Sequence, residues 1–454
     1  MNPFIQMMIY IVAIANVVNV LHFGLFIGGA NLYDIKAMRA RRLAKKQIAR
    51  AAKQPRLSVI VPAHNEEVGI VRTLDSLRQS TYGNAEIVVV DDGSEDATAQ
   101  VVRRYASRPI LQRVETRIGR DMLDLRLRRK AGRAIVPTLP IKLVSQPNAG
   151  KGAAVNNGMR NHATGELLMT LDADSTVQPT TLANAAKYFE NDKVIGVAAN
   201  VRVMGRGWLG MLQRFEHMVG YRSKKFYTMT NSEFIVGGVA STYRRGVLEE
   251  VGYYDTDTQT EDIGLSMKLV NKLGNRDKRI VYAADVVAMT EGVQTYKALI
   301  KQRYRWKLGS LQNLYRYRDM IAATSETHSR MLTWYRLPIA LFGEFLLILE
   351  PLMLTYVMYL SVVHQSVAIF LGAYVTVTLY TMWTIWPDEH MTNRQKLVMS
   401  ANSLVIYILF YAMTLVQLMA IFKVLGNFRK VYDLRGQSGT WTSPARALQP
   451  QAAI

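Results

Sequence analysis

Two short runs of the sequence, LSVIVPAHNEE (residues 57–67) and AEIVVVDDGSED (residues 85–96), decide the class of fold. Each run begins with the β-branched residues typical of a buried strand and ends in a polar cluster. A helical pattern from about Val68 to Gln79 separates them, which predicts a βαβ unit with parallel strands. In sheets of this kind ligands bind beyond the carboxyl ends of the strands, where both polar clusters lie. No GxGxxG pattern follows the first strand, so a dinucleotide fold of that type is not indicated.

The composition limits the classes of protein that need to be considered. A chain of 454 residues, apolar at both ends and polar in the middle, suits one large soluble domain with a membrane region. The absence of cysteine excludes disulfides, thiolate nucleophiles and cysteine-ligated metals. A net charge of +21 favours a polyanion or an anionic membrane surface. Because much of this charge borders the apolar stretches, nucleic acid is not expected as a partner.

The N-terminal region, residues 1–35, is predicted to form a transmembrane helix. Residues 4–29 contain no charged side chain and are long enough to cross a hydrocarbon core of about 30 Å. A signal peptide is the alternative, but neither a basic n-region nor a cleavage site is present. A basic linker, residues 36–56, follows, and the positive-inside rule places it in the cytoplasm.

The C-terminal region, residues 335–426, contains three further apolar stretches at 337–363, 367–386 and 397–422. Glu344 and Glu350 lie in the first, so they are expected to face protein, water or a polar substrate path, or else to snorkel to the interface. Three crossings would leave the basic tail, residues 427–454, outside, against the positive-inside rule. Either one segment is re-entrant or the rule fails here.

The chemistry is expected between these regions. Asp172 and Asp174 form a DxD pair at a strand end and could face one hard cation, Mg²⁺ or Mn²⁺, that takes its remaining ligands from a diphosphate. Lys151, flanked by two glycines, is a cation suited to approach phosphate or a base edge. A solvated acidic turn is the alternative for the DxD pair.

Six motifs together resemble the membrane-embedded family 2 glycosyltransferases, which include cellulose, chitin, hyaluronan and poly-N-acetylglucosamine synthases. They occur in the family's order over residues 57–306: PAHNEE, VVVDDGSEDAT, NAGKGAAVNNGM, LDADS, TEDIGLSMKL and QRYRW. The resemblance implies an α/β GT-A domain over residues 57–290, with a mixed, mainly parallel sheet and flanking helices, plus an α-helical transmembrane region. It also implies a nucleotide-sugar donor, a divalent cation and inversion at the anomeric carbon.

The resemblance also implies roles for single residues. Asp91, Asp92, Pro62 and Glu66 resemble the uridine pocket, while Asp172 and Asp174 resemble the metal pair, with Asp174 the direct ligand. Glu261 and Asp262 belong to a TED motif in which Asp262 is the general base, because an alcohol is a poor nucleophile near neutral pH. The alternative is an acidic helix N-terminus before residues 263–272.

The QRYRW motif, residues 302–306, lies in an interfacial segment at 291–334. Arg303 and Arg305 can supply positive charge to the departing diphosphate. In the resembling synthases the motif lies at the acceptor end, so Gln302 and Trp306 are expected to contact the sugar. Interfacial anchoring by the arginines and Trp306 is the alternative.

The expected activity is polymerisation of a UDP-sugar into a β-linked polysaccharide that passes across the membrane. The first choice of donor is UDP-N-acetylglucosamine. TEDIGLS lacks the double aspartate and arginine typical of hyaluronan synthases. The alternatives are a hyaluronan-, chitin- or cellulose-type synthase, or a non-processive transferase that acts on a lipid-linked acceptor. A pure transporter would leave the middle domain without chemistry. The expected location is a bacterial inner membrane with the catalytic domain in the cytoplasm, and an accessory subunit is possible.

One segment departs from the family. An insertion at about 107–140 carries nine arginines and lysines with leucines among them. It is predicted to bind a membrane surface or a partner, and a solvated arginine-rich loop is the alternative.

Overall fold

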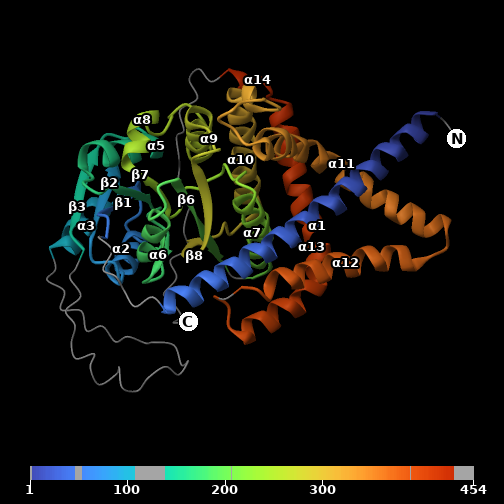
Figure 1. Cartoon of the computed structure of the whole chain (residues 1–454), viewed down its shortest axis with the longest axis horizontal. Helices are drawn as coiled ribbons and strands as arrows, with labels where there is room; N and C mark the ends of the chain where they lie inside the picture. The colour runs from blue at the N-terminus through green and yellow to red at the C-terminus, as the bar shows by residue number, and fades with distance from the viewer. Residues whose placement is uncertain (1–2, 47–53, 108–138, 206, 389, 434–454) are drawn as a thin grey trace.

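The computed structural model describes residues 3–46, 54–107, 139–205, 207–388 and 390–433 (Figure 1). Its centre is an eight-stranded sheet in the order β3-β2-β1-β4-β7-β6-β8-β5. The first four of these strands run parallel, whereas β7 is antiparallel to both its neighbours. The strands are β1 Leu57–Ala63, β2 Ala85–Asp92, β3 Ile141–Gln146, β4 Leu167–Thr170, β5 Thr176–Val177, β6 Val194–Met204, β7 Ser241–Arg244 and β8 Arg279–Glu291. The prediction of a mixed, mainly parallel sheet is confirmed.

Helices cover both faces of the sheet because its strands alternate between two apolar clusters. Val59 and Val61 of β1 point to one cluster and Ile60 to the other. The helices around the sheet are α2 Ile70–Arg78, α3 Thr98–Ala106, α5 Lys151–Asn157, α6 Thr181–Tyr188, α7 Gly207–Met229, α8 Arg245–Val251, α9 Glu261–Leu273, α10 Tyr296–Arg316 and α14 Arg429–Tyr432. Shorter turns are the π-helical Gly158–His162 and Met331–Arg336 and the 3-10 turn Arg318–Met320.

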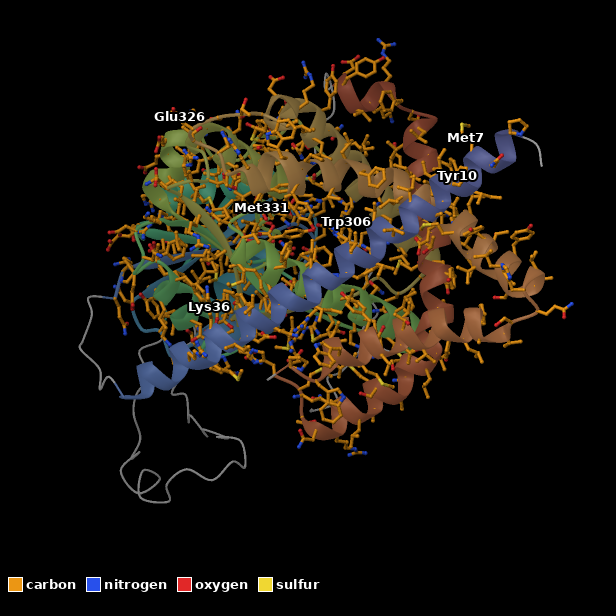
Figure 2. The ribbon with its side chains drawn as sticks, turned by 45° about the vertical axis from the view of Figure 1, so that its right-hand side comes forward. Met7, Tyr10, Lys36, Trp306, Glu326 and Met331 are labelled. Carbon is orange, nitrogen blue, oxygen red and sulfur yellow. The ribbon has the colours of Figure 1, made fainter. Side chains whose placement is uncertain are left out.

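The N-terminal helix α1 spans Pro3–Lys46, so it continues past the predicted boundary at residue 35 into the basic stretch. Its first half packs on α11, where Val12 meets Met353. Its second half packs on α7, where Asp34 forms an ion pair with Arg222. Figure 2 shows Met7 and Tyr10 at the projecting end of α1 and Lys36 at the end beside the α/β domain.

The C-terminal helices are α11 Leu337–Val363, α12 Val367–Ile385 and α13 Asn393–Leu425. In Figure 1, α11 and α12 form a hairpin that projects from the domain, on the side where α1 also projects. By length and composition, Ile9–Arg39 and Leu346–Val363 could each cross a membrane, and Phe370–Ile385 and Tyr411–Leu425 are shorter apolar helices.

Helix α13 does not project with this hairpin. Near its start, Met399 packs with Leu212 of α7, and near its end Val424 packs with Leu308 of α10. At about 1.5 Å per residue its 33 residues extend about 50 Å, so the helix lies along the face of the domain. The third apolar stretch, 397–422, thus packs on the domain, and its crossing of a membrane stays a prediction.

Most of the arginine-rich insertion, residues 47–53 of the basic linker and most of the tail lie outside the described residues. The predictions for these segments are not tested.

Candidate active site

The carboxyl ends of β1, β2 and β4 lie side by side, and three of the polar motifs follow them directly. Strand β1 is the central member, paired in parallel with β2 on one side and β4 on the other. PAHNEE, DDGSED and DADS therefore meet at one edge of the sheet, as the βαβ pattern predicts. This edge is the candidate donor site.

Asp92, the last residue of β2, holds the loop that leads to Lys151. Its Oδ1 accepts hydrogen bonds from Gln146 Nε2 at 2.7 Å and from the Ala149 backbone N–H at 2.9 Å. Its Oδ2 accepts from the Gly150 backbone N–H at 2.8 Å. Asp92 therefore positions the loop that leads to Lys151, and its predicted contact with the uridine stays a prediction.

The other three residues predicted to surround the uridine gather beside this loop. Pro62 ends β1 opposite β2, and Asp91 accepts a hydrogen bond on Oδ1 from the Ser94 backbone N–H at 3.3 Å. Glu66 is buried, and its backbone N–H donates to Thr98 Oγ1 at 2.8 Å. Pro62, Glu66 and Asp91 thus lie at one edge, and their contact with uridine stays a prediction.

Lys151 joins the DxD and TED motifs. Gly150 adopts a φ of 90°, a backbone conformation that favours glycine, and α5 begins at the next residue. Lys151 Nζ then lies 2.7 Å from Asp172 Oδ1 and 3.8 Å from Glu261 Oε1. Burial opposes the charge, but these two carboxylates raise the pKa of Lys151 above its ordinary value. The lysine is therefore a paired cation at the centre of the site.

Asp262 lies in the first turn of α9, where its Oδ1 accepts from the Ile263 backbone N–H at 2.8 Å. Burial, with the neighbouring Glu261, raises the pKa of Asp262 to about 6. Gly238 faces it, since a Cβ there would lie 3.6 Å from Asp262 Oδ2 and 3.3 Å from Lys151 Nζ. Sequence analysis missed Gly238, whose only signal was the glycine pair at 237–238.

Helix α10 is clamped onto the TED turn and brings Arg305 to it. A Cβ at Gly309 would collide with Thr260, so the two elements touch. Asn313 Nδ2 donates to the Thr260 carbonyl at 3.2 Å. Arg305 lies one turn before Gly309 on the same helix face, and its charge acts on both carboxylates of the TED motif. Asn313 was also missed from the sequence.

Arg303 pairs with a carboxylate outside the TED motif, and its predicted role at the diphosphate stays a prediction. It is buried, forms an ion pair with Glu216 of α7 and lies 4.1 Å from the centre of the Trp306 ring. Gln417 Nε2 of α13 donates to the same Glu216 at 3.4 Å. Arg303 therefore fixes Trp306, and only Arg305 of the two arginines lies near the TED carboxylates.

Gln302 and Trp306 share one face of α10, four residues apart. Trp306 is 38% exposed, and its ring lies 6.5 Å from that of His217. Gln302 Oε1 is buried and accepts no hydrogen bond from the described residues. A flat apolar ring beside an unused amide oxygen suits a sugar that carries hydroxyl donors.

Glu344 faces protein, as expected for a carboxylate in an apolar helix. Its Oε2 lies 2.8 Å from Lys307 Nζ, directly after the QRYRW motif. Glu350 lies beside Thr414 of α13. These contacts tie α10 to α11 and α11 to α13.

The DxD pair provides two carboxylates for a cation. Asp174 Oδ1 accepts from Ser175 Oγ at 2.9 Å, and Asp172 is paired with Lys151. Within the described ranges no group of three or more His, Asp or Glu side chains could hold a metal. The donor set fits a Mg²⁺-type ion that keeps waters and shares a substrate diphosphate, rather than an all-protein metal site.

Comparison with known proteins places this geometry in a family. Residues 167–420 match "Glycosyl transferase family group 2", and residues 58–120 match "Glycosyl transferase family 2". The poly-beta-1,6-N-acetyl-D-glucosamine synthase of Staphylococcus aureus (strain COL) is 27% identical over 264 residues, and that of Staphylococcus epidermidis is 26% identical over 264 residues. Each match covers 57% of this chain and 56% of the relative, so the chain spans little more than half the length of these relatives.

A solved structure is similar over most of the chain. The mannosyltransferase PcManGT from Pyrobaculum calidifontis, in complex with GDP-Man and Mn²⁺, covers 87% of this chain and 98% of its own, with 23% identity and a TM-score of 0.50. At this identity the likeness supports the fold alone, a GT-A domain. Since the first family match covers more than half of the sequence, the chain belongs to the glycosyl transferases of family group 2.

Proposed function

We propose that this inverting glycosyltransferase extends a β-linked polysaccharide from UDP-N-acetylglucosamine and passes the product across a membrane. The observation that carries the proposal is the position of Trp306, on the helix that contacts both the TED turn and the apolar helix α11. The similarity to poly-beta-1,6-N-acetyl-D-glucosamine synthases supports N-acetylglucosamine as the sugar.

Asp262 is the proposed general base. It takes the proton from the acceptor hydroxyl as that oxygen bonds to the anomeric carbon, and the bond from this carbon to the diphosphate breaks on the opposite face. Burial suits the role, since a carboxylate with a raised pKa is the stronger base. The configuration at the anomeric carbon is inverted.

The leaving group is a nucleoside diphosphate. Asp172 and Asp174 would hold Mg²⁺ or Mn²⁺, which neutralises diphosphate charge when bound. Arg305 adds a fixed positive charge beside the TED motif. Lys151 exchanges its contact with Asp172 for the diphosphate when donor binds.

The acceptor end of the site is Trp306 with Gln302. Arg303 and Glu216 hold the Trp306 ring in place, so the terminal sugar of the acceptor meets a fixed platform. Helix α11 begins shortly after α10, and the Lys307–Glu344 pair joins them. A product that leaves Trp306 would therefore meet the apolar helices.

We expect Trp306→Ala to retain hydrolysis of UDP-N-acetylglucosamine and to shorten or abolish the polymer, because the diphosphate site remains while the acceptor platform is lost. The assay supplies a panel of nucleotide sugars with Mg²⁺ or Mn²⁺ and sizes the product. Trp334→Ala, at an exposed tryptophan of the turn before α11, is the matched control. Polymer of wild-type length from Trp306→Ala would refute the platform, and a single-sugar lipid product from wild type would favour a lipid-acceptor transferase.

For the membrane we propose three crossings, by α1, α11 and α12, with the catalytic domain in the cytoplasm. Lys36 lies at the end of α1 beside the domain, and Arg39 follows it on the same helix, which fits the positive-inside rule. Helix α13 instead lies along the membrane surface. Its outward face is apolar, with Leu404, Leu415 and Met419 at least half exposed, and suits contact with lipid.

This arrangement returns the C-terminus to the cytoplasm and removes the conflict over the basic tail. Because the chain has no cysteine, single cysteines can test it directly. In intact cells a membrane-impermeant maleimide should label His364→Cys, between α11 and α12, and spare Asn393→Cys and Asn427→Cys at the two ends of α13. Labelling of Asn427→Cys in unbroken cells would show that α13 crosses the bilayer.

A further inference from the structure

We propose that a cavity beside α7 binds the phosphate-bearing headgroup of an anionic lipid. The cavity measures about 650 Å³ and lies between α7, β6, the inner end of α1 and the α12–α13 connection. Sites for small molecules commonly measure about 300–1,000 Å³. The proposal rests on the membrane placement proposed above.

Charge favours an anion. Five cationic side chains against two carboxylates line the described part of the cavity, a formal excess of three: Arg202, Arg214, Arg222, Lys225 and Arg394 against Asp34 and Asp388. Such an excess in a concave wall attracts negative charge, which sits near a cytoplasmic membrane surface in the form of lipid phosphates.

The cations form an inner and an outer group. Arg202 pairs with Asp388, and Arg222 and Lys225 share Asp34. Arg214 and Arg394 are exposed, and neither forms an ion pair with any described carboxylate. Arg214 Nη1 donates a hydrogen bond to the Gly205 carbonyl at 3.1 Å, so a ligand can meet the outer pair without breaking an ion pair.

Two inner donors lack an acceptor. The Nε atoms of Arg202 and Arg222 are buried and make no hydrogen bond within the described part of the chain. Because these two atoms are closed to solvent, they do not themselves face the cavity, and Arg202 and Arg222 line it with other atoms of their side chains. A phosphate has several acceptor oxygens and suits guanidinium groups.

The remaining wall favours a lipid over a free anion. Met211, Met218, Val398 and Met399 add apolar surface beside the cations. A small soluble anion has no apolar atoms to pack against this surface, whereas the glycerol and upper acyl region of a lipid has such atoms. In the proposed placement, the inner end of α1 and the α12–α13 connection both lie at the cytoplasmic surface, where this part of a lipid is found.

The test uses the full chain in phosphatidylcholine vesicles with or without phosphatidylglycerol. The double variant Arg214→Gln/Arg394→Gln removes only the outer cations. The charge-matched control is Lys187→Gln/Lys193→Gln, which changes two exposed lysines, one on α6 and one directly before β6. Lipids retained after detergent extraction are measured by mass spectrometry. We expect wild type and control to enrich phosphatidylglycerol over the bulk mixture, and the double variant to lose about fivefold of binding per cation removed.

Equal enrichment in the double variant and wild type would overturn the proposal. Displacement of phosphatidylglycerol by inorganic phosphate or glycerol phosphate at matched ionic strength would also overturn it, in favour of a soluble phosphate ligand. Flotation of each variant with vesicles is measured first, because failure to float counts against the membrane placement and not against the site. None of these readouts depends on sugar transfer.

Discussion

Asp262→Asn is expected to lower sugar transfer by about 10²–10⁴-fold, the range that a positioned general base contributes. Asn keeps the shape of the side chain and the hydrogen bond from the Ile263 backbone N–H but cannot accept a proton. Transfer is measured at saturating donor, with donor binding measured separately and expected to be within a few-fold of wild type. Asp277→Asn, at a side chain that is 87% exposed, is the matched control. An Asp262→Asn enzyme within tenfold of the wild-type rate would exclude Asp262 as the base.

The same variant should unfold at an equal or higher temperature than wild type. Burial raises the pKa of Asp262 to about 6, so its charged form costs free energy in the folded protein at neutral pH. The raised pKa means that protonation favours the folded state, an advantage that is present at low pH and lost as pH rises through about 6. Removal of the charge should raise the free energy of unfolding by at most about 3 kcal/mol near neutral pH. A variant less stable than wild type would show that the carboxylate stabilises the fold.

Activity has the opposite pH dependence. The base must be ionised to accept a proton, so kcat/KM is expected to fall about tenfold per pH unit below about 6 and to level off above it. The pH profile of kcat/KM measures this limb in the free enzyme. A rate that is constant from pH 7 down to pH 5 would contradict the assignment.

Asp174→Ala is expected to reduce transfer by roughly 10²–10³-fold or more, because loss of a metal ligand removes several kcal/mol of charge stabilisation at the diphosphate. Excess EDTA should reduce the transfer rate of the wild-type enzyme in the same way. Added Mn²⁺ or Mg²⁺ should restore transfer in the wild-type enzyme but not in Asp174→Ala. Binding of Mn²⁺ in the presence of UDP, followed by electron paramagnetic resonance, gives a readout apart from activity. Full activity in excess EDTA would eliminate a metal at this pair.

Sequence analysis predicted that the polar motifs meet at one edge of the sheet, because the βαβ pattern and the order of motifs are local properties. Polar clusters lie at the ends of β1, β2 and β4, which are Ala63, Asp92 and Thr170, and parallel pairing of β1 with β2 and β4 brings them together. It also identified Lys151, Asp172 and Glu261, which the structure joins within 4 Å. Each of these residues lies inside a contiguous motif.

Roles within a motif were harder to predict, because they depend on partners far away in the chain. Asp92 bonds to residues more than 50 positions later, and Arg303 pairs with Glu216, 87 positions earlier. A motif shows which residue types are present, but it does not show which of them already have a protein partner. Asn313 and Gly238 escaped notice for the same reason, since their contacts with the TED motif are long-range.

For the apolar helices, the sequence alone determined one property and the tertiary structure determined another. The apolar character of α1, α11, α12 and α13, and the basic stretch that follows α1, are evident from residue type. The orientation of α13 relative to the domain is not evident from residue type, because both faces of this helix are apolar for different reasons. One face packs on α7 and α10 through Val416 and Val424, while the other leaves Leu404, Leu415 and Met419 exposed. A helix that is apolar all round can cross a bilayer or lie between a domain and its lipid surface, and only its long-range contacts distinguish the two.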